Sequence, residues 1–154
     1  MRPADLVRMP LLAALLTLAS GCATVKEPPP APAITLSKAI HFIRPDGGDV
    51  LVSPGTYEVK PGSGAQMELV SSLGLSNKNQ TLEAVATDIG QSLDAPAALY
   101  IPWENDEHHI ILVQPSGQGL EAVGSGSRVR SRGAGYHLLP SAVVKKALGS
   151  LQAK

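Results

Sequence analysis

Short clusters of turn-forming residues divide most of the chain from residue 45 onward. Glycine in these clusters permits a positive φ, proline presets φ, and asparagine, aspartate and serine hydrogen-bond to the nearby backbone. The clusters lie at 45–48, 53–55, 61–64, 76–79, 104–106 and 115–119. Because the apolar segments between these reversals have the length of strands, the chain is predicted to be mainly β.

Within these segments, apolar and polar side chains alternate. Tyr57 and Val59 face one way between polar neighbours, and so do Met67 and Leu69. This two-residue period is typical of antiparallel strands with one buried face. Strands are predicted at 39–44, 49–52, 56–60, 66–70 and 110–113, the last of them apolar on both faces and therefore central. The predicted fold is a small antiparallel β-sandwich or barrel.

Residues 81–93 fit two interpretations. Leu82, Val85, Ala86, Ile89 and Leu93 have helical spacing, yet Leu82, Ala84 and Ala86 also alternate. Gly90 weakens a helix. A strand is preferred here because the neighbouring segments are strands.

The C-terminal segment predicts a short helix that packs on the domain. Val144, Ala147, Leu148 and Leu151 form one apolar stripe at helical spacing, and Ser141 is placed to cap the first turn. A helix of this length is marginal alone, so its stripe needs a partner surface.

The N-terminal residues 1–21 have the three parts of a secretory signal peptide. Arg2 and Arg8 make the start basic, 9–18 is uncharged and mostly apolar, and small residues follow. The apolar run is shorter than the about 20 residues that a transmembrane helix needs. The alternative is a buried helix of the fold, and the proline-rich stretch downstream argues against it.

The only cysteine of the chain, Cys22, ends the segment "ASGC". This segment resembles the lipobox of bacterial lipoproteins. The resemblance implies that the Cys22 thiol receives a diacylglyceryl group, that the signal is cut before Cys22, and that the new amino terminus is usually acylated. Ala23 in place of aspartate implies sorting to the outer membrane. The expected location is therefore the cell envelope, with the lipid bilayer as a partner through acylated Cys22.

Three regions follow from these features. They are a signal peptide (1–21), a lipidated cysteine with a proline-rich linker (22–33), and one β-rich domain (34–154). Proline favours an extended polyproline conformation, so the linker is expected to hold the domain away from the membrane surface. The β-rich domain is long enough for a single hydrophobic core.

Charge and cysteine content exclude several classes of protein. The chain has 13 basic and 13 acidic residues, so it lacks the strongly basic character of a nucleic-acid-binding domain and no nucleic acid is expected as a partner. One cysteine cannot form an intramolecular disulfide or a multi-cysteine zinc site.

The segment 105–110, "NDEHHI", is the first candidate site. On a strand, neighbouring side chains point to opposite faces, so His108 and His109 are not expected to share one metal ion. The pairs expected on the same face are Asp106 with His108, and Glu107 with His109. The alternative is a polar hairpin turn with one histidine partly buried against the core.

A zinc site in this segment would need one or two further ligands, for which His41 and His137 are the candidates. Asp106, His108 and His109 are therefore low-ranking metal candidates, and no cofactor is predicted. The sequence lacks G-x-S-x-G and S-x-x-K, so no hydrolase motif is present.

The second candidate site lies in 124–135, "GSGSRVRSRGAG". Arg128, Arg130 and Arg132 alternate with other residues, so an extended chain would project all three guanidinium groups from one face. Guanidinium forks suit phosphate or carboxylate, and an anionic envelope polymer or lipid headgroup is a conceivable ligand. The alternative is a solvated edge strand that charge keeps from aggregating.

Two hypotheses for function remain open. The first is a membrane-anchored envelope lipoprotein whose non-catalytic β-rich module binds an envelope protein or an anionic envelope polymer, or plays a structural part. The second is a metal-dependent or hydrolytic envelope enzyme that uses Asp106, His108 and His109. The segments "AIHFIRPDGGDVLVSPGTYEVK" and "DEHHIILVQPSGQGLEAVGSGSRVRSRG" resemble small exported bacterial domains without an assigned function. That resemblance implies no activity and favours strands around residue 85.

Overall fold

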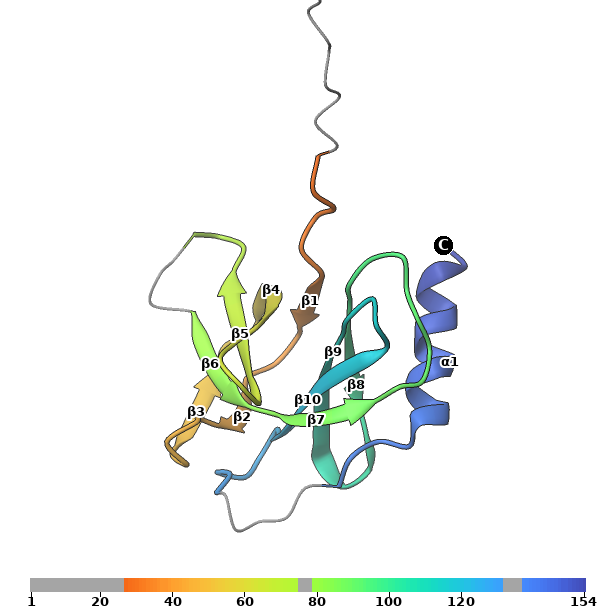
Figure 1. The fold of residues 1–154 in the computed structure, drawn as a ribbon. Coiled ribbons are helices and arrows are strands. Elements are labelled where there is room, and N and C mark those ends of the chain that lie inside the picture. Colours follow the sequence, from red (N-terminus) through yellow and green to blue (C-terminus); the bar gives the residue numbers. More distant parts are fainter. Residues whose placement is uncertain (1–26, 75–78, 132–136) are drawn as a thin grey trace, which may run out of the picture.

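The computed structural model describes residues 27–74, 79–131 and 137–154 (Figure 1). The signal peptide, Cys22, Ala23, Arg132 and most of the turn cluster at 76–79 lie outside these residues. The strands are β1 (Ala33–Leu36), β2 (Ile40–Ile43), β3 (Asp49–Val52), β4 (Gly55–Pro61), β5 (Gln66–Ser71), β6 (Gln80–Glu83), β7 (Val85–Asp88), β8 (Ala97–Pro102), β9 (Glu107–Val113) and β10 (Gln118–Ser125). The helix α1 (Ser141–Gln152) follows at the C-terminus.

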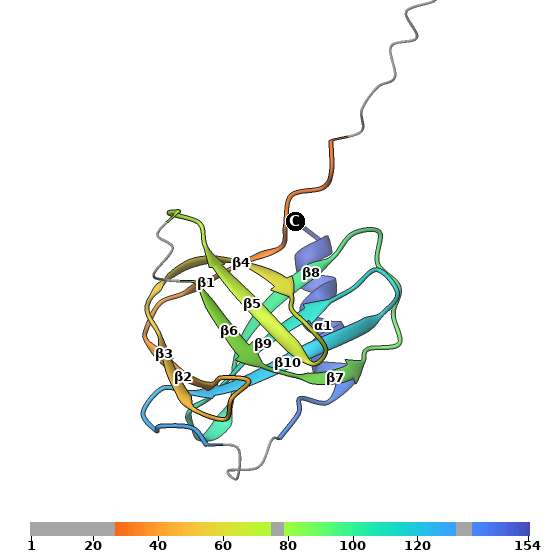
Figure 2. The same ribbon diagram turned by 60° about the vertical axis from the view of Figure 1, so that its left-hand side comes forward.

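Two antiparallel sheets make up the β-structure. The smaller sheet has the strand order β1-β4-β5-β6, and the larger has β3-β2-β10-β9-β8, with β7 pairing with β10 off this path. The chain passes from one sheet to the other at Ala84, between β6 and β7. The described strands form no closed barrel, and Figure 2 shows the two sheets facing each other. The predicted β-sandwich with a short C-terminal helix is confirmed.

Each of the five predicted strands is present, with ends that differ by up to three residues. The segment 81–93 is extended as preferred, because it contains most of β6 and all of β7. Its last residues, 89–93, form no strand. Gly90 has φ +65°, a conformation that glycine adopts readily and that ends the extended run.

The main core lies between the two sheets. Tyr57, Val59, Met67 and Leu69 are all buried there, as the alternation predicted. The larger sheet contributes the following buried residues to the same cluster: Ile40, Phe42, Val52, Ala98, Ile110, Leu112 and Ala122. This layer holds the sheets together by burial, since each large apolar side chain removed from water contributes about 1.5–3 kcal/mol.

A second core lies on the outer face of the larger sheet, under α1. Ile111 and Val113 of β9 pack there with Val144 and Leu148 of α1. Strand β9 is thus buried on both faces, as its apolar run predicted. Leu151, expected in the helix stripe, is instead 48% exposed.

The predicted helix cap at Ser141 is wrong. The residue before the first turn is Pro140, and no side chain caps that end. Ser141 is instead the first helical residue. Pro140 is extended, with φ −56° and ψ 139°, and sets the direction in which the chain enters the helix.

Strand β2 crosses β10 closely at Gly124. The two strands pair only at Ser125 and His41. A Cβ atom at Gly124 would lie 2.7 Å from Cγ2 of Ile40, 2.7 Å from Cε1 of Phe42 and 2.8 Å from the His41 carbonyl oxygen. The crossing therefore requires glycine.

We expect Gly124→Ala to lower the free energy of unfolding by about 1–3 kcal/mol, the usual cost of overpacking a core. The control is Gly149→Ala in α1, where an added Cβ meets nothing within 4 Å and should stabilise the helix by about 0.5–1 kcal/mol. Urea unfolding followed by circular dichroism measures both. Equal midpoints for wild type and Gly124→Ala would contradict the close crossing.

Candidate functional site

The polar residues of the first candidate site lie in a tight turn between β8 and β9 and at the start of β9. Asn105 and Asp106 have φ 56° and 60°, a left-handed conformation that asparagine and aspartate tolerate better than most residues. The Glu107 amide closes the turn by donating to the Glu104 carbonyl. Strand β9 begins at once, so the side chains that follow alternate between the two faces of the larger sheet.

On the inner face, His108 is held between Tyr100 and Asp106. Its Nδ1 lies 2.9 Å from the Tyr100 hydroxyl, and its Nε2 lies 3.3 Å from Oδ1 of Asp106. With the Nε2 proton donated to the carboxylate, the hydroxyl donates to Nδ1, and the two rings stack at 5.9 Å. Burial lowers the pKa of His108 and raises that of Tyr100, so both groups are held neutral.

Asp106 gathers four side chains at this end of the sheets. The Ser127 hydroxyl donates to Oδ2 at 2.7 Å, the Ser125 hydroxyl donates to the same oxygen at 3.3 Å, and Lys38 Nζ lies 3.3 Å from Oδ1. The bond from Ser127, followed by those from Lys38 and His108, holds the pKa of Asp106 well below its ordinary value, against the opposing effect of burial. Asp106 is therefore an ionised centre that fixes the segment after β10.

On the outer face, His109 and Glu121 form a fully buried pair. His109 Nδ1 lies 2.7 Å from Oε1 of Glu121, and both side chains are 0% exposed. The Leu139 amide donates to the same oxygen at 3.0 Å. One carboxylate oxygen thus joins β9, β10 and the chain leading into α1.

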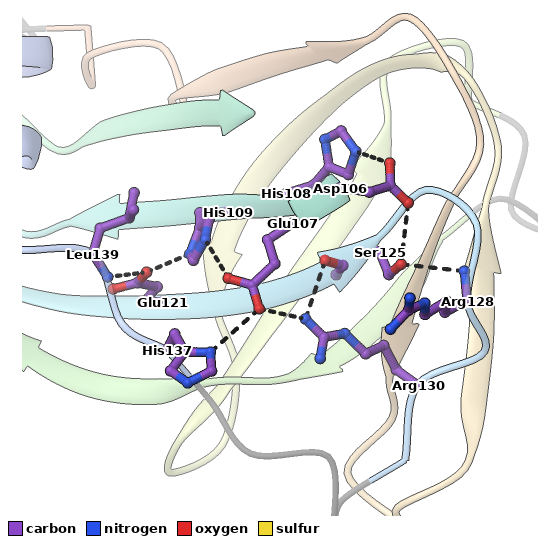
Figure 3. Close-up of polar contacts among 11 residues, drawn as sticks. Asp106, Glu107, His108, His109, Glu121, Ser125, Arg128, Arg130, His137 and Leu139 are labelled. Atoms are coloured by element: carbon purple, nitrogen blue, oxygen red, sulfur yellow. Dashed lines mark hydrogen bonds and ion pairs between the residues drawn. The ribbon is translucent and has the colours of Figure 1, made fainter. Parts of the chain in front are cut away.

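Glu107 extends this cluster toward the surface (Figure 3). Its carboxylate lies 3.6 Å from His109 Nε2, 3.5 Å from a terminal nitrogen of Arg130, and 3.5 Å from His137 Nδ1. Arg130 also donates to the Gly124 carbonyl at 3.4 Å. The Arg130 side chain is only 12% exposed, so Glu107 and the strand end hold it against the sheet.

A pocket of about 300 Å³ opens beside Glu107. We call it the Arg128 pocket, and it is lined by Asn105, Glu107, Ser125, Arg128, Val129, Arg130 and His137. The Arg128 amide donates to Ser125 Oγ at 3.2 Å. Its guanidinium has no partner among the described residues, so a free cation lines the pocket.

The alternation predicted for the histidines is confirmed. His108 and His109 lie on opposite faces, and the same-face pairs Asp106–His108 and Glu107–His109 are both present. Of the further metal candidates, His41 pairs with Asp49 at 2.9 Å, whereas His137 joins Glu107. Across the described ranges, no group of three or more histidine, cysteine, aspartate or glutamate side chains is placed to hold a metal ion.

The arginine segment is not the edge strand of the alternative interpretation, because residues 126–131 form no strand. Arg132, the third arginine of the predicted anion site, lies outside the described residues. Arg128 and Arg130 nevertheless line the same pocket. The Arg130 amide donates to Asp49 Oδ1 at 2.9 Å, which turns the loop back onto β3.

Sequence reasoning missed Glu121, Tyr100 and Lys38. A signal for Glu121 was present, because a carboxylate stands between apolar residues in "GLEAVG". The turn at 114–117 sets the register that pairs Glu121 with Ile111 and Val123 with His109, which brings Glu121 diagonal to His109. Predicting that Tyr100 and Lys38 belong to the site requires the order of the strands in the sheets, which no local sequence pattern gives.

Ser125 and Ser127 form no hydrogen bond with His108 or His109. The two ring nitrogens of His108 face Tyr100 and Asp106, and those of His109 face Glu121 and Glu107. Ser125 and Ser127 donate to Asp106 and not to a histidine. A serine nucleophile needs a histidine base within hydrogen-bond reach, so these contacts form no such pair.

Comparison with protein-family models, curated protein sequences and solved structures found no match to the chain.

Removing the buried acceptor should unfold the domain more easily. We expect Glu121→Ala to lower the free energy of unfolding by about 3 kcal/mol, because His109 and the Leu139 amide lose their acceptor inside the protein. The control is Glu58→Ala, which breaks an exposed pair with Lys60 and should cost under about 1 kcal/mol. Denaturant unfolding tests both, and equal losses would contradict the central role of Glu121.

Acid should destabilise the domain in two separate ranges. Burial lowers the pKa of His108 below its ordinary 6.5. Neutral His108 therefore contributes fully to the free energy of unfolding above about pH 6.5, and this contribution declines as the pH falls below that value. The pKa of Asp106 is lowered from 3.8, so its contribution is present above about pH 4 and is lost below it.

The free energy of unfolding measured against pH tests this assignment. His108→Gln should flatten the curve just below about pH 6.5, and Asp106→Asn should flatten it below about pH 4. Curves for the two variants that stay parallel to wild type throughout would show that neither group carries the acid dependence.

Proposed function

We propose that this protein is a lipid-anchored envelope protein whose β-rich domain is a non-catalytic binding module. The anchor is acylated Cys22, and the binding site is the Arg128 pocket. The partner is an envelope protein or polymer that presents an anionic group. The free guanidinium of Arg128 in this pocket is the observation that carries the binding proposal.

The arrangement of the domain is compatible with such an anchor. Residues 27–32 leave the domain at the end where α1 also finishes (Figure 1). The β8–β9 turn, the loop after β10 and the start of α1 lie at the opposite end in both ribbon views (Figures 1 and 2). A tether on the N-terminal side would therefore leave the Arg128 pocket facing away from the bilayer.

No helix in the described ranges is long and apolar enough to cross a membrane.

The electrostatics of the pocket favour a negatively charged ligand. Arg130 is matched by Glu107 at 3.5 Å, whereas the Arg128 guanidinium is unmatched among the described residues. An unmatched guanidinium offers a planar fork of donors to a carboxylate or phosphate. The same pocket has no paired nucleophile and base, which supports binding over hydrolysis.

The anchor is tested by Cys22→Ala. We expect the variant to lose labelling by a radioactive fatty-acid precursor and to leave the membrane fraction, because the acyl chains supply the membrane affinity. The matched control is Ser20→Ala, which keeps the thiol and a small residue before it. Unchanged labelling and fractionation of Cys22→Ala would refute the lipid anchor.

The binding site is tested by charge reversal in the full-length tethered protein. We expect Arg128→Glu to reduce retention of the protein on isolated cell-wall and envelope fractions at least tenfold, as loss of a charged hydrogen bond predicts. The control is Lys146→Glu on the exposed face of α1, which changes the net charge equally. Retention of both variants at the wild-type level would remove the Arg128 pocket as the binding site.

A further inference from the structure

We propose that the Arg128 pocket binds one carboxylate group of its partner, and not a phosphate monoester. This inference rests on the proposed binding function and names the chemistry of its ligand. A carboxylate occurs both at the C-terminus of a peptide and on an acidic side chain, so the two sources share the recognition chemistry.

The charged residues that line the pocket leave one positive charge unmatched, which a monoanion would neutralise. Glu107 and Arg130 lie 3.5 Å apart and offset each other, which leaves Arg128 as the one permanent charge without a match among the described lining residues. A carboxylate brings one negative charge and restores balance. A phosphate monoester brings about 1.5 to 2 negative charges, and the excess would lie next to the Glu107 carboxylate.

The loop that carries Arg128 is fixed at both ends. Asp106 accepts from the Ser125 hydroxyl at 3.3 Å, and Ser125 Oγ accepts from the Arg128 amide at 3.2 Å. Two residues on, the Arg130 amide donates to Asp49 at 2.9 Å. The backbone on either side of Arg128 is therefore held by the carboxylates of Asp106 and Asp49, which reduces the entropy that the loop would lose on binding.

A second arginine, Arg130, lines the same pocket. Glu107 and the Gly124 carbonyl orient the Arg130 guanidinium, and its buried Nε has no hydrogen-bond partner among the described residues. Asn105 and Ser125 add polar groups to the lining. At about 300 Å³, the pocket is at the small end of the range for ligand sites, so it suits one group of a partner.

Nuclear magnetic resonance titration of the full-length chain in an uncharged detergent tests the inference. The probes are N-acetyl-diglycine with a free terminal carboxylate, its C-terminal amide, N-acetyl-aspartyl methylamide, and inorganic phosphate. The signals followed are the backbone amide and the Nε–H of Arg128. We expect saturable shifts with at least one of the two carboxylate probes, no shifts with the amide, and weaker binding of phosphate.

Two arginine variants separate recognition by the guanidinium fork from general charge attraction. Arg128→Lys keeps the charge but loses the planar fork, so the dissociation constant of the carboxylate probe should rise about tenfold. Arg44→Lys is the matched control, because Arg44 forms an exposed pair with Asp46 and does not line the pocket; it should leave the constant unchanged.

The outcomes distinguish the ligand class from the binding function itself. Shifts from the free acid alone identify a terminal carboxylate, and shifts from the aspartyl probe identify an acidic side chain; either supports the inference. Equal responses to acid and amide, or tighter binding of phosphate, overturn it while retention on envelope fractions through Arg128 still stands. Failure of both experiments overturns the binding function as well.

Discussion

The structure depends on one buried carboxylate oxygen. Oε1 of Glu121 accepts from His109 at 2.7 Å and from the Leu139 amide at 3.0 Å, and the side chains of both His109 and Glu121 are fully buried. A buried polar group without partners is costly. If the segment before α1 left the sheet, the hydrogen bond from the Leu139 amide to Glu121 would be lost, so this bond holds the segment in place. The bond thereby fixes where α1 starts, and it keeps His137 beside Glu107 at the rim of the Arg128 pocket.

The pocket arises where two polar clusters meet at one end of the larger sheet. Alternation along β9 sends His108 to the inner face, where Asp106 of the preceding turn meets it, and sends Glu107 and His109 to the outer face. Asp106 fixes the start of the loop after β10, and Glu107 orients Arg130. Arg128 lies between these anchored positions with its guanidinium unpaired among the described residues. Packing and charge pairing among the described residues thus leave the Arg128 guanidinium unmatched, at the end of the domain opposite to residues 27–32 (Figure 1).

Local patterns in the sequence predicted β2 to β5, the extended segment that holds β7, the end of β9 and the division of the histidines, because two-residue alternation survives any sheet order. They did not predict β1, β8 or β10. The same patterns failed where distant segments meet. Glu121 stands in an apolar strand, and only the register of β9 with β10 brings it to His109. Arg130 was expected to project with its neighbours, yet Asp49 and Glu107 turn it inward. Ser141 was expected to cap α1, yet Pro140 takes that position.

Hydrogen exchange at the Leu139 amide tests the central interaction most directly, since this amide belongs to no helix or strand and its protection depends on Glu121. We expect the Leu139 amide to exchange as slowly as the buried amides in β9, because exposing it to water requires loss of its hydrogen bond to Glu121. Exchange at the rate of an unstructured chain, with β9 still protected, would contradict the claim that Glu121 holds the segment before α1.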